Sequence, residues 1–162
     1  MATILWDEAI KKALEVLQHK DQYAYFMGAK GEVLTDARMD LLMNVYKDYF
    51  SKYTAAEKQD IKNWSRGKIG FDCSGFVGYC IGDHSYSGSQ IDHCKKKTTV
   101  LANGVAGSVL WKPGHVGLDI GYGFFLHFPV EKQSCTLGRI REYNWQLSGE
   151  SSYVNYAGAD AR

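Results

Sequence analysis

Apolar positions in the first part of the chain recur at the spacing of amphipathic helices. One stripe runs over residues 6–17, and Thr3 precedes it as a candidate helix cap. A second follows Thr35, and a third begins at Thr54-x-x-Glu57, the sequence of a capping box. The stripes predict three helices, built on Trp6, Ile10, Ala13, Leu14 and Leu17, on Met39, Leu42, Met43 and Tyr46, and on Ile61 and Trp64.

The stretch "GFDCSGFVGYCIG", residues 70–82, predicts a fourth helix. Asp72 is its candidate cap, and Phe76 and Cys80 lie four positions apart on one apolar face. Cys73 therefore falls in the first turn of the helix, whereas Cys80 is expected to pack in the core.

The second half of the chain has a residue pattern typical of β-strands. Residues 82–106 are polar and glycine-rich without a sustained period, which predicts a long surface connection. From residue 107 onward, short β-branched and aromatic runs alternate with glycines. These runs predict antiparallel strands at "SVLW", "HVGLDI", "FFLHF", "RIREY" and "YVNYAGA".

Helices followed by strands predict an α+β fold. The 162 residues are enough for one hydrophobic core, so we expect a single domain over residues 1–162. Its helical half would cover about 1–81, the connection 82–106 and the β-rich half about 107–162. We expect the N-terminal helices to pack on one face of a C-terminal antiparallel sheet.

Composition and charge exclude several kinds of partner. The chain is 45% hydrophobic and 23% charged, as is typical of a globular protein. Its 19 Lys and Arg against 18 Asp and Glu leave a net charge of +1, so we expect no nucleic acid partner, and the lysines at 95–97 are expected in a solvated loop. No apolar stretch reaches transmembrane length, and charges interrupt the N-terminus where a signal peptide would have its apolar core. We therefore expect no membrane insertion and no export signal; the oligomeric state is left open.

The four cysteines follow neither a disulfide nor a metal pattern. No C-x-x-C occurs, and no His or Cys pairs stand at the spacing of a zinc finger. We therefore expect no metal site. The sequence predicts no chemical role for Cys94, Cys135, His19, His84 and His93.

Cys73 and two histidines can be combined into a nucleophilic site. The first turn of a helix carries partial positive charge, which lowers the pKa of a cysteine and favours its thiolate. His115 and His127 lie on runs expected to form neighbouring antiparallel strands, where two rings can face one another. These residue types fit a nucleophile, a base and an orienting partner. On spacing alone, a packed and inert Cys73 is the alternative.

The motifs themselves narrow this choice. "FDCSGFVGY", "GHVGLDIGYG" and a later "LH" occur in the order found in the NlpC-type cell-wall cysteine peptidases, and the sequence resembles this papain-like family. Upstream, "YFMGAKGE" resembles the family's Tyr-x-x-Gly-Gly element, with Ala29 in place of the second glycine. The resemblance spans about residues 23–128.

The resemblance implies a catalytic triad and a reaction. Cys73 would be the nucleophile, His115 the general base and acid, and His127 the orienting third member. The partner would be a peptidoglycan stem peptide, cut between D-glutamate and the diamino acid that follows, through a thioester intermediate. Neither a metal nor an organic cofactor is implied.

The resemblance also implies residues around the cleft. Tyr25 would help to form the oxyanion site together with the backbone N–H of Cys73. Asp72 and Ser74 would border the substrate cleft, where they can meet the amine of a stem peptide.

Two features depart from the family pattern. The segment 31–70 holds the second and third predicted helices and is longer than in compact members, and Asp119 stands where an aromatic residue is common. Alternative functions are a Cys/His amidase that cuts another wall bond, a non-catalytic wall-binding module, and a toxin-like effector that acts on protein. The lack of an export signal fits a phage or prophage lysin, an injected effector, or a domain of a longer exported protein.

Overall fold

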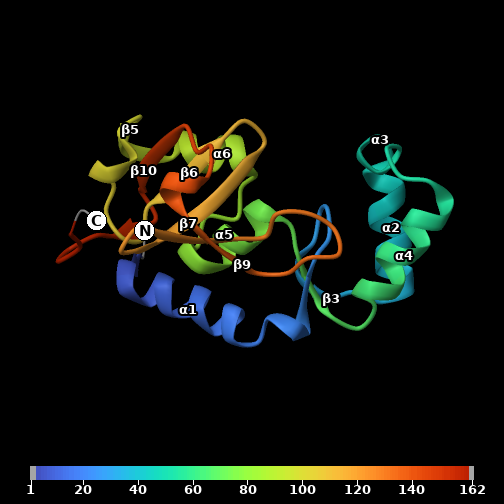
Figure 1. Cartoon of the computed structure of the whole chain (residues 1–162). Helices are drawn as coiled ribbons and strands as arrows, with labels where there is room; N and C mark the ends of the chain where they lie inside the picture. The colour runs from blue at the N-terminus through green and yellow to red at the C-terminus, as the bar shows by residue number, and fades with distance from the viewer. Residues whose placement is uncertain (1–2, 161–162) are drawn as a thin grey trace.

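The main sheet of the computed structural model, which describes residues 3–160, has six antiparallel strands and lies in the larger, left-hand part of Figure 1. The strands follow the order β5-β10-β6-β7-β8-β9, and each neighbouring pair runs antiparallel. Their bounds are β5 (Cys94–Thr98), β6 (Val109–Lys112), β7 (His115–Gly121), β8 (Phe124–His127), β9 (Thr136–Arg139) and β10 (Leu147–Ser151).

Two helices, α1 (Trp6–Gln18) and α5 (Cys73–Ile81), pack on each other and on β7. Since almost every side of α5 is apolar or small, the helix is buried nearly throughout, and its Phe76 and Val77 share one core cluster with apolar residues of β7 and β8. The short helix α6 (Ser87–Asp92) lies against β6 and β10. Single turns of 3-10 helix occur at Lys20–Gln22, Leu101–Asn103 and Ile140–Glu142, and β1 (Ile4–Leu5) pairs in parallel with β11 (Val154–Asn155).

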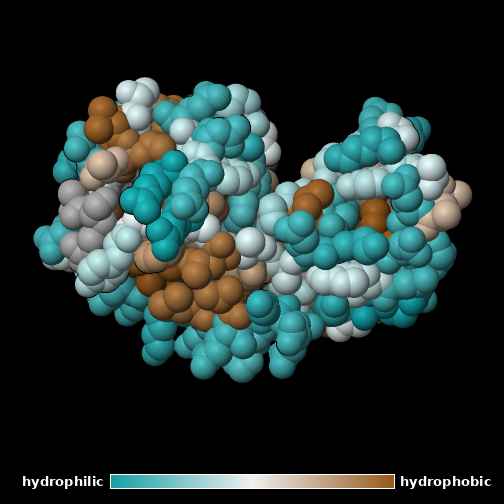
Figure 2. Space-filling model, viewed as in Figure 1, coloured by the Kyte–Doolittle hydropathy of each residue, from teal (hydrophilic) through white to brown (hydrophobic). Residues whose placement is uncertain are grey.

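A second helical group stands apart from the main sheet. It consists of α2 (Asp36–Val45), α3 (Lys47–Phe50) and α4 (Ala55–Ser65), and Figure 1 shows it at the right, away from the main sheet. The group has its own core, and Figure 2 shows a hollow in the molecular surface between it and the larger part of the protein. A small sheet in the order β2-β4-β3 lies beside it, built from β2 (Tyr23–Tyr25), β4 (Ile69–Phe71) and β3 (Lys30–Val33).

The structure confirms the α+β class and several local predictions. Thr35 caps α2 with its side chain, and Thr54 and Glu57 make both hydrogen bonds of the capping box at α4. Asp72 caps α5, and Cys80 is fully buried in that helix. These features depend on contacts between residues close in sequence, which explains why the sequence reveals them.

Other local predictions are wrong. Thr3 does not cap α1, because the N-cap residue is Leu5 and no side chain caps this helix. "RIREY" contains a 3-10 turn after β9 instead of a strand, and "YVNYAGA" contributes only β11, outside the main sheet. The first half of the chain, predicted to be helical, also contains β2, β3 and β4.

The segment 82–106 is more than a connection, since it contains α6 and β5. The predicted loop lysines 95–97 are indeed exposed, but they belong to β5, the edge strand that pairs with β10. Charged residues are common on edge strands because they discourage pairing with another chain. Neither β5 nor β10 has the β-branched and aromatic run by which the other strands were predicted.

The capping box of α4 generates a stability prediction. Replacing Thr54 with Ala removes the acceptor of the Glu57 N–H, so Thr54→Ala is expected to lower the free energy of unfolding by about 1 kcal/mol. Thr54→Ser keeps the hydroxyl and is the matched control. Urea unfolding followed by circular dichroism measures both, and equal stability of the two variants would contradict the prediction.

Candidate active site

Cys73 is the first residue of α5, directly after the cap Asp72. The preceding strand β4 delivers the chain to this point, and the Asp72 carboxylate accepts the Gly75 N–H at 2.7 Å. The thiol is half-buried and lies beside the start of β7, since the backbone of Val116 hydrogen-bonds it. The predicted position of Cys73 in the first helical turn is therefore confirmed.

The surroundings of the Cys73 thiol favour its neutral form. Burial, with the Asp72 charge in addition, raises the pKa of Cys73 to about 11. Hydrogen bonds from the backbone of Val116 and Ser74 and the charge of Lys30 act in the opposite direction but do not prevail. The net shift is opposite to the one expected from the helix start alone, so Cys73 requires a base to become a thiolate.

His115 and His127 form a direct pair on β7 and β8. Leu118 lies opposite Leu126, and continuing this register places the two histidines as diagonal neighbours at one end of the strands. Nε2 of His115 lies 2.8 Å from Nδ1 of His127, the distance of a hydrogen bond. The structure thus brings together the two histidines that the sequence placed on neighbouring strands.

Both histidines are neutral at physiological pH. Burial lowers the pKa of His115 to about 4, and burial together with the His115 charge lowers the pKa of His127 to about 3. In a neutral pair one ring donates and the other accepts. If His115 donates through Nε2 to Nδ1 of His127, its own Nδ1 is left unprotonated and can accept a proton.

Aromatic side chains enclose the pair. Trp145 stacks on His115 with ring centroids 5.3 Å apart and an interplanar angle of 7°, while Phe125 and Tyr143 meet His127 edge-on. This shell restricts the orientation of the rings and contributes to the burial that keeps them neutral. Neither Tyr143 nor Trp145 was predicted at the site, because "RIREY" with Tyr143 was interpreted as a strand and Trp145 lies outside every predicted element.

Tyr25 lies at the end of β2 and is 4% exposed. Burial raises the pKa of its phenol, with Tyr49 and Cys73 acting in the same direction, so Tyr25 is a neutral hydrogen-bond donor. Tyr49 of α3 also interacts with Glu131, which accepts the Tyr53 hydroxyl at 2.7 Å. The helical group thereby contacts the neighbourhood of the thiol, a connection that the sequence analysis missed.

Asp72 and Ser74 flank the thiol but face Lys30. The Lys30 ammonium lies 2.9 Å from Asp72 Oδ1 and 3.1 Å from Ser74 Oγ. Lys30 is the first residue of β3 and follows Ala29 in the stretch "YFMGAKGE". Lys30 is recognised as a neighbour of the site only from its contact with Asp72 in the folded structure.

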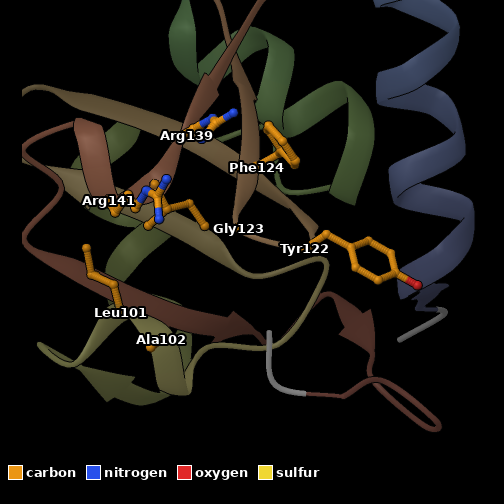
Figure 3. Close-up of a pocket in the computed structure, with 8 residues that line it drawn as sticks. Leu101, Ala102, Tyr122, Gly123, Phe124, Arg139 and Arg141 are labelled. Carbon is orange, nitrogen blue, oxygen red and sulfur yellow. The ribbon is translucent and has the colours of Figure 1, made fainter.

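A separate pocket of about 390 Å³ lies at the β7–β8 turn (Figure 3). It is lined by Phe124, Arg139 and Arg141 among others, and contains no cysteine or histidine. Since β7 runs from His115 to this turn, the pocket is about 20 Å from His115 along the strand. Thiol chemistry therefore belongs to the other end of the sheet.

Residues 3–160 contain no group of three or more His, Cys, Asp or Glu side chains placed to hold a metal ion. Over the same range, no helix has the length and apolar character needed to cross a bilayer.

The fold is similar to that of solved NlpC/p60 domains. The NlpC/p60 domain of the peptidoglycan hydrolase SagA aligns with 91% of this chain and 99% of its own, with a TM-score of 0.53 and 17% identity. NlpC1 from Trichomonas vaginalis aligns with 90% of this chain and 44% of its own (TM-score 0.53, 14% identity). The peptidoglycan hydrolase RipB from Mycobacterium tuberculosis aligns with 93% of this chain and 67% of its own (TM-score 0.50, 18% identity).

These likenesses define the class of the protein as the papain-like NlpC/p60 fold. They confirm, for the fold, the resemblance to the NlpC-type family that three short sequence motifs indicated. No protein-family profile and no curated protein sequence matches the chain. The comparisons therefore establish a likeness of fold.

The raised pKa of Cys73 predicts how the thiol reacts with an alkylating agent. Because the thiolate fraction grows with pH up to a pKa of about 11, labelling of Cys73 by iodoacetamide is expected to accelerate throughout the range from about pH 6 to 10. Mass spectrometry of the peptide that contains Cys73 measures the rate, and the buried Cys80 serves as an unlabelled control. A rate that is already constant from about pH 7 upward would show a preformed thiolate and contradict the prediction.

Proposed function

We propose that the protein is a cysteine peptidase that hydrolyses stem peptides of peptidoglycan. One observation carries the proposal: a half-buried Cys73 at the start of α5 lies beside the first residues of β7, where His115 is hydrogen-bonded to His127. A cysteine, a base and a group that orients the base are the parts that acyl transfer needs. The similarity of the fold to SagA and RipB, both described as peptidoglycan hydrolases, supports the choice of substrate.

The neutral pair makes His115 a general base. As the Cys73 sulfur attacks the amide carbonyl, Nδ1 of His115 takes the thiol proton, and His127 accepts the hydrogen bond from Nε2 that stabilises the resulting imidazolium. The backbone N–H of Cys73 and the phenol of Tyr25 are the proposed donors to the developing oxyanion. The C–N bond breaks when His115 returns the proton to the leaving amine.

A thioester on Cys73 completes the proposed cycle. Water attacks the thioester carbonyl while His115 again removes a proton, the C–S bond breaks, and the proton returns to the thiolate. The bond proposed to be cut lies between D-glutamate and the following diamino acid of the stem peptide. Residues 1–162 are proposed to form a single catalytic domain, and the protein is proposed to be a phage or prophage lysin. No step uses a metal or an organic cofactor.

Digestion of purified peptidoglycan tests this proposal. Cys73→Ala is expected to lower the release of stem-peptide fragments by at least about 1,000-fold, because the variant lacks the thiol that is proposed to attack the amide. Cys94→Ala is the matched control, since Cys94 lies on the edge strand β5 and should leave the activity unchanged. The masses of the fragments identify the bond that is cut.

Three outcomes would contradict the proposal. Intact stem peptides that begin with a free L-alanine amine and carry no glycan would instead indicate an amidase. Undiminished release by Cys73→Ala would exclude Cys73 as the nucleophile. A wild-type protein that binds peptidoglycan of several chemotypes without releasing fragments would be a binding module.

A further inference from the structure

Lys30 occupies the rim of the candidate active site. Its ammonium lies 2.9 and 3.1 Å from the two oxygens of Asp72 and 3.1 Å from the hydroxyl of Ser74. Asp72 and Ser74 are the chain neighbours of Cys73, so the ammonium lies close to the thiol. The Lys30 side chain is 45% exposed, so solvent and a ligand can reach part of it.

The Asp72 carboxylate is already occupied by groups of the protein. Oδ1 accepts the Gly75 N–H at 2.7 Å and the Ser74 hydroxyl at 3.3 Å, and Oδ2 accepts the Gly28 N–H at 3.1 Å. With Lys30 on both oxygens as well, the buried carboxylate has little acceptor capacity left. A substrate amine would therefore find few free acceptor positions on Asp72 and would meet the like charge of Lys30.

We propose that Lys30 determines specificity by binding a carboxylate of the substrate beside the bond that is cut. Asp72 holds the ammonium in place, and a substrate carboxylate would replace the Ser74 hydroxyl as the acceptor of one ammonium N–H, since a charged acceptor makes the stronger hydrogen bond. This inference rests on the proposed function and names the substrate group that the site selects. In a stem peptide linked through the γ-carboxyl of D-glutamate, the free α-carboxylate of that residue is the anion nearest to the proposed scissile bond.

A purely structural role for Lys30 makes a different prediction. If Lys30 only neutralised the buried Asp72, its removal would affect every substrate to the same degree. If it binds the substrate carboxylate, its removal would affect only substrates that carry this charge. Two stem peptides that differ in one group separate these roles, because the α-carboxylate of D-glutamate can be replaced by the carboxamide.

The experiment compares kcat/KM for the carboxylate and carboxamide peptides. The wild-type protein is expected to prefer the carboxylate by about 10-fold or more, and Lys30→Met to cleave the two peptides at nearly equal rates. Lys30→Gln, which can still donate hydrogen bonds to Asp72, is the second neutral variant in case Lys30→Met does not fold. Lys62→Met is the matched control, as Lys62 pairs with Asp40 in the helical group and should keep the wild-type preference.

The outcomes separate this inference from the proposed function. Equal cleavage of the two peptides by the wild type, or an unchanged preference in a folded neutral variant, would overturn the role of Lys30 and leave the peptidase proposal intact. An equal loss on both peptides in the Lys30 variants would show the structural role instead. If the wild type cleaves neither peptide, the proposed function fails and this inference fails with it.

Discussion

The Asp72 carboxylate is the contact on which the arrangement of the site depends. It caps α5 through the Gly75 N–H and binds the β2–β3 turn through the Gly28 N–H. One buried carboxylate therefore connects the helix that begins with Cys73 to the β2–β3 turn. A Cβ atom at Gly75 would meet the Ala29 carbonyl oxygen at 2.6 Å, which requires glycine at this point of close approach. The Asp-Cys-Ser-Gly sequence is therefore a structural unit as well as a chemical one.

Burial determines how the proposed chemistry starts. It raises the pKa of Cys73 and lowers those of His115 and His127, so thiol and imidazoles are neutral in the free protein. Proton transfer then accompanies attack on the substrate instead of preceding it. The stacking of Trp145 on His115 adds to this effect, because the indole covers the ring that receives the proton.

The sequence predicts those parts of the fold that depend on short-range patterns. The caps Thr35, Thr54 and Asp72 can be recognised from neighbouring residues. The pairing of the two histidines follows from their places in two consecutive short runs that predict neighbouring antiparallel strands. The order of three motifs was enough to indicate the papain-like architecture that the solved NlpC/p60 domains share.

The parts that escaped prediction depend on contacts between distant residues. The segment 82–106 is held by Gln90, whose buried side chain donates to the carbonyl oxygens of Ser74 and Asp83, and no periodicity reveals such bonds. Trp145 and Lys30 reach the site only because the sheet and the β2–β3 turn bring them there. The direction of the Cys73 pKa shift was also missed, since burial is a property of the packed structure and the helix start is a local one.

Capture of the covalent intermediate is the most direct test of a Cys73 nucleophile served by a neutral histidine pair. The protein would be mixed with a stem peptide, quenched in acid at successive times and digested for mass spectrometry. The account predicts that the peptide containing Cys73 transiently gains the mass of the N-terminal substrate fragment less one water, as a thioester requires. Hydrolysis with Cys73 unmodified at every time, or an adduct on another residue, would contradict it.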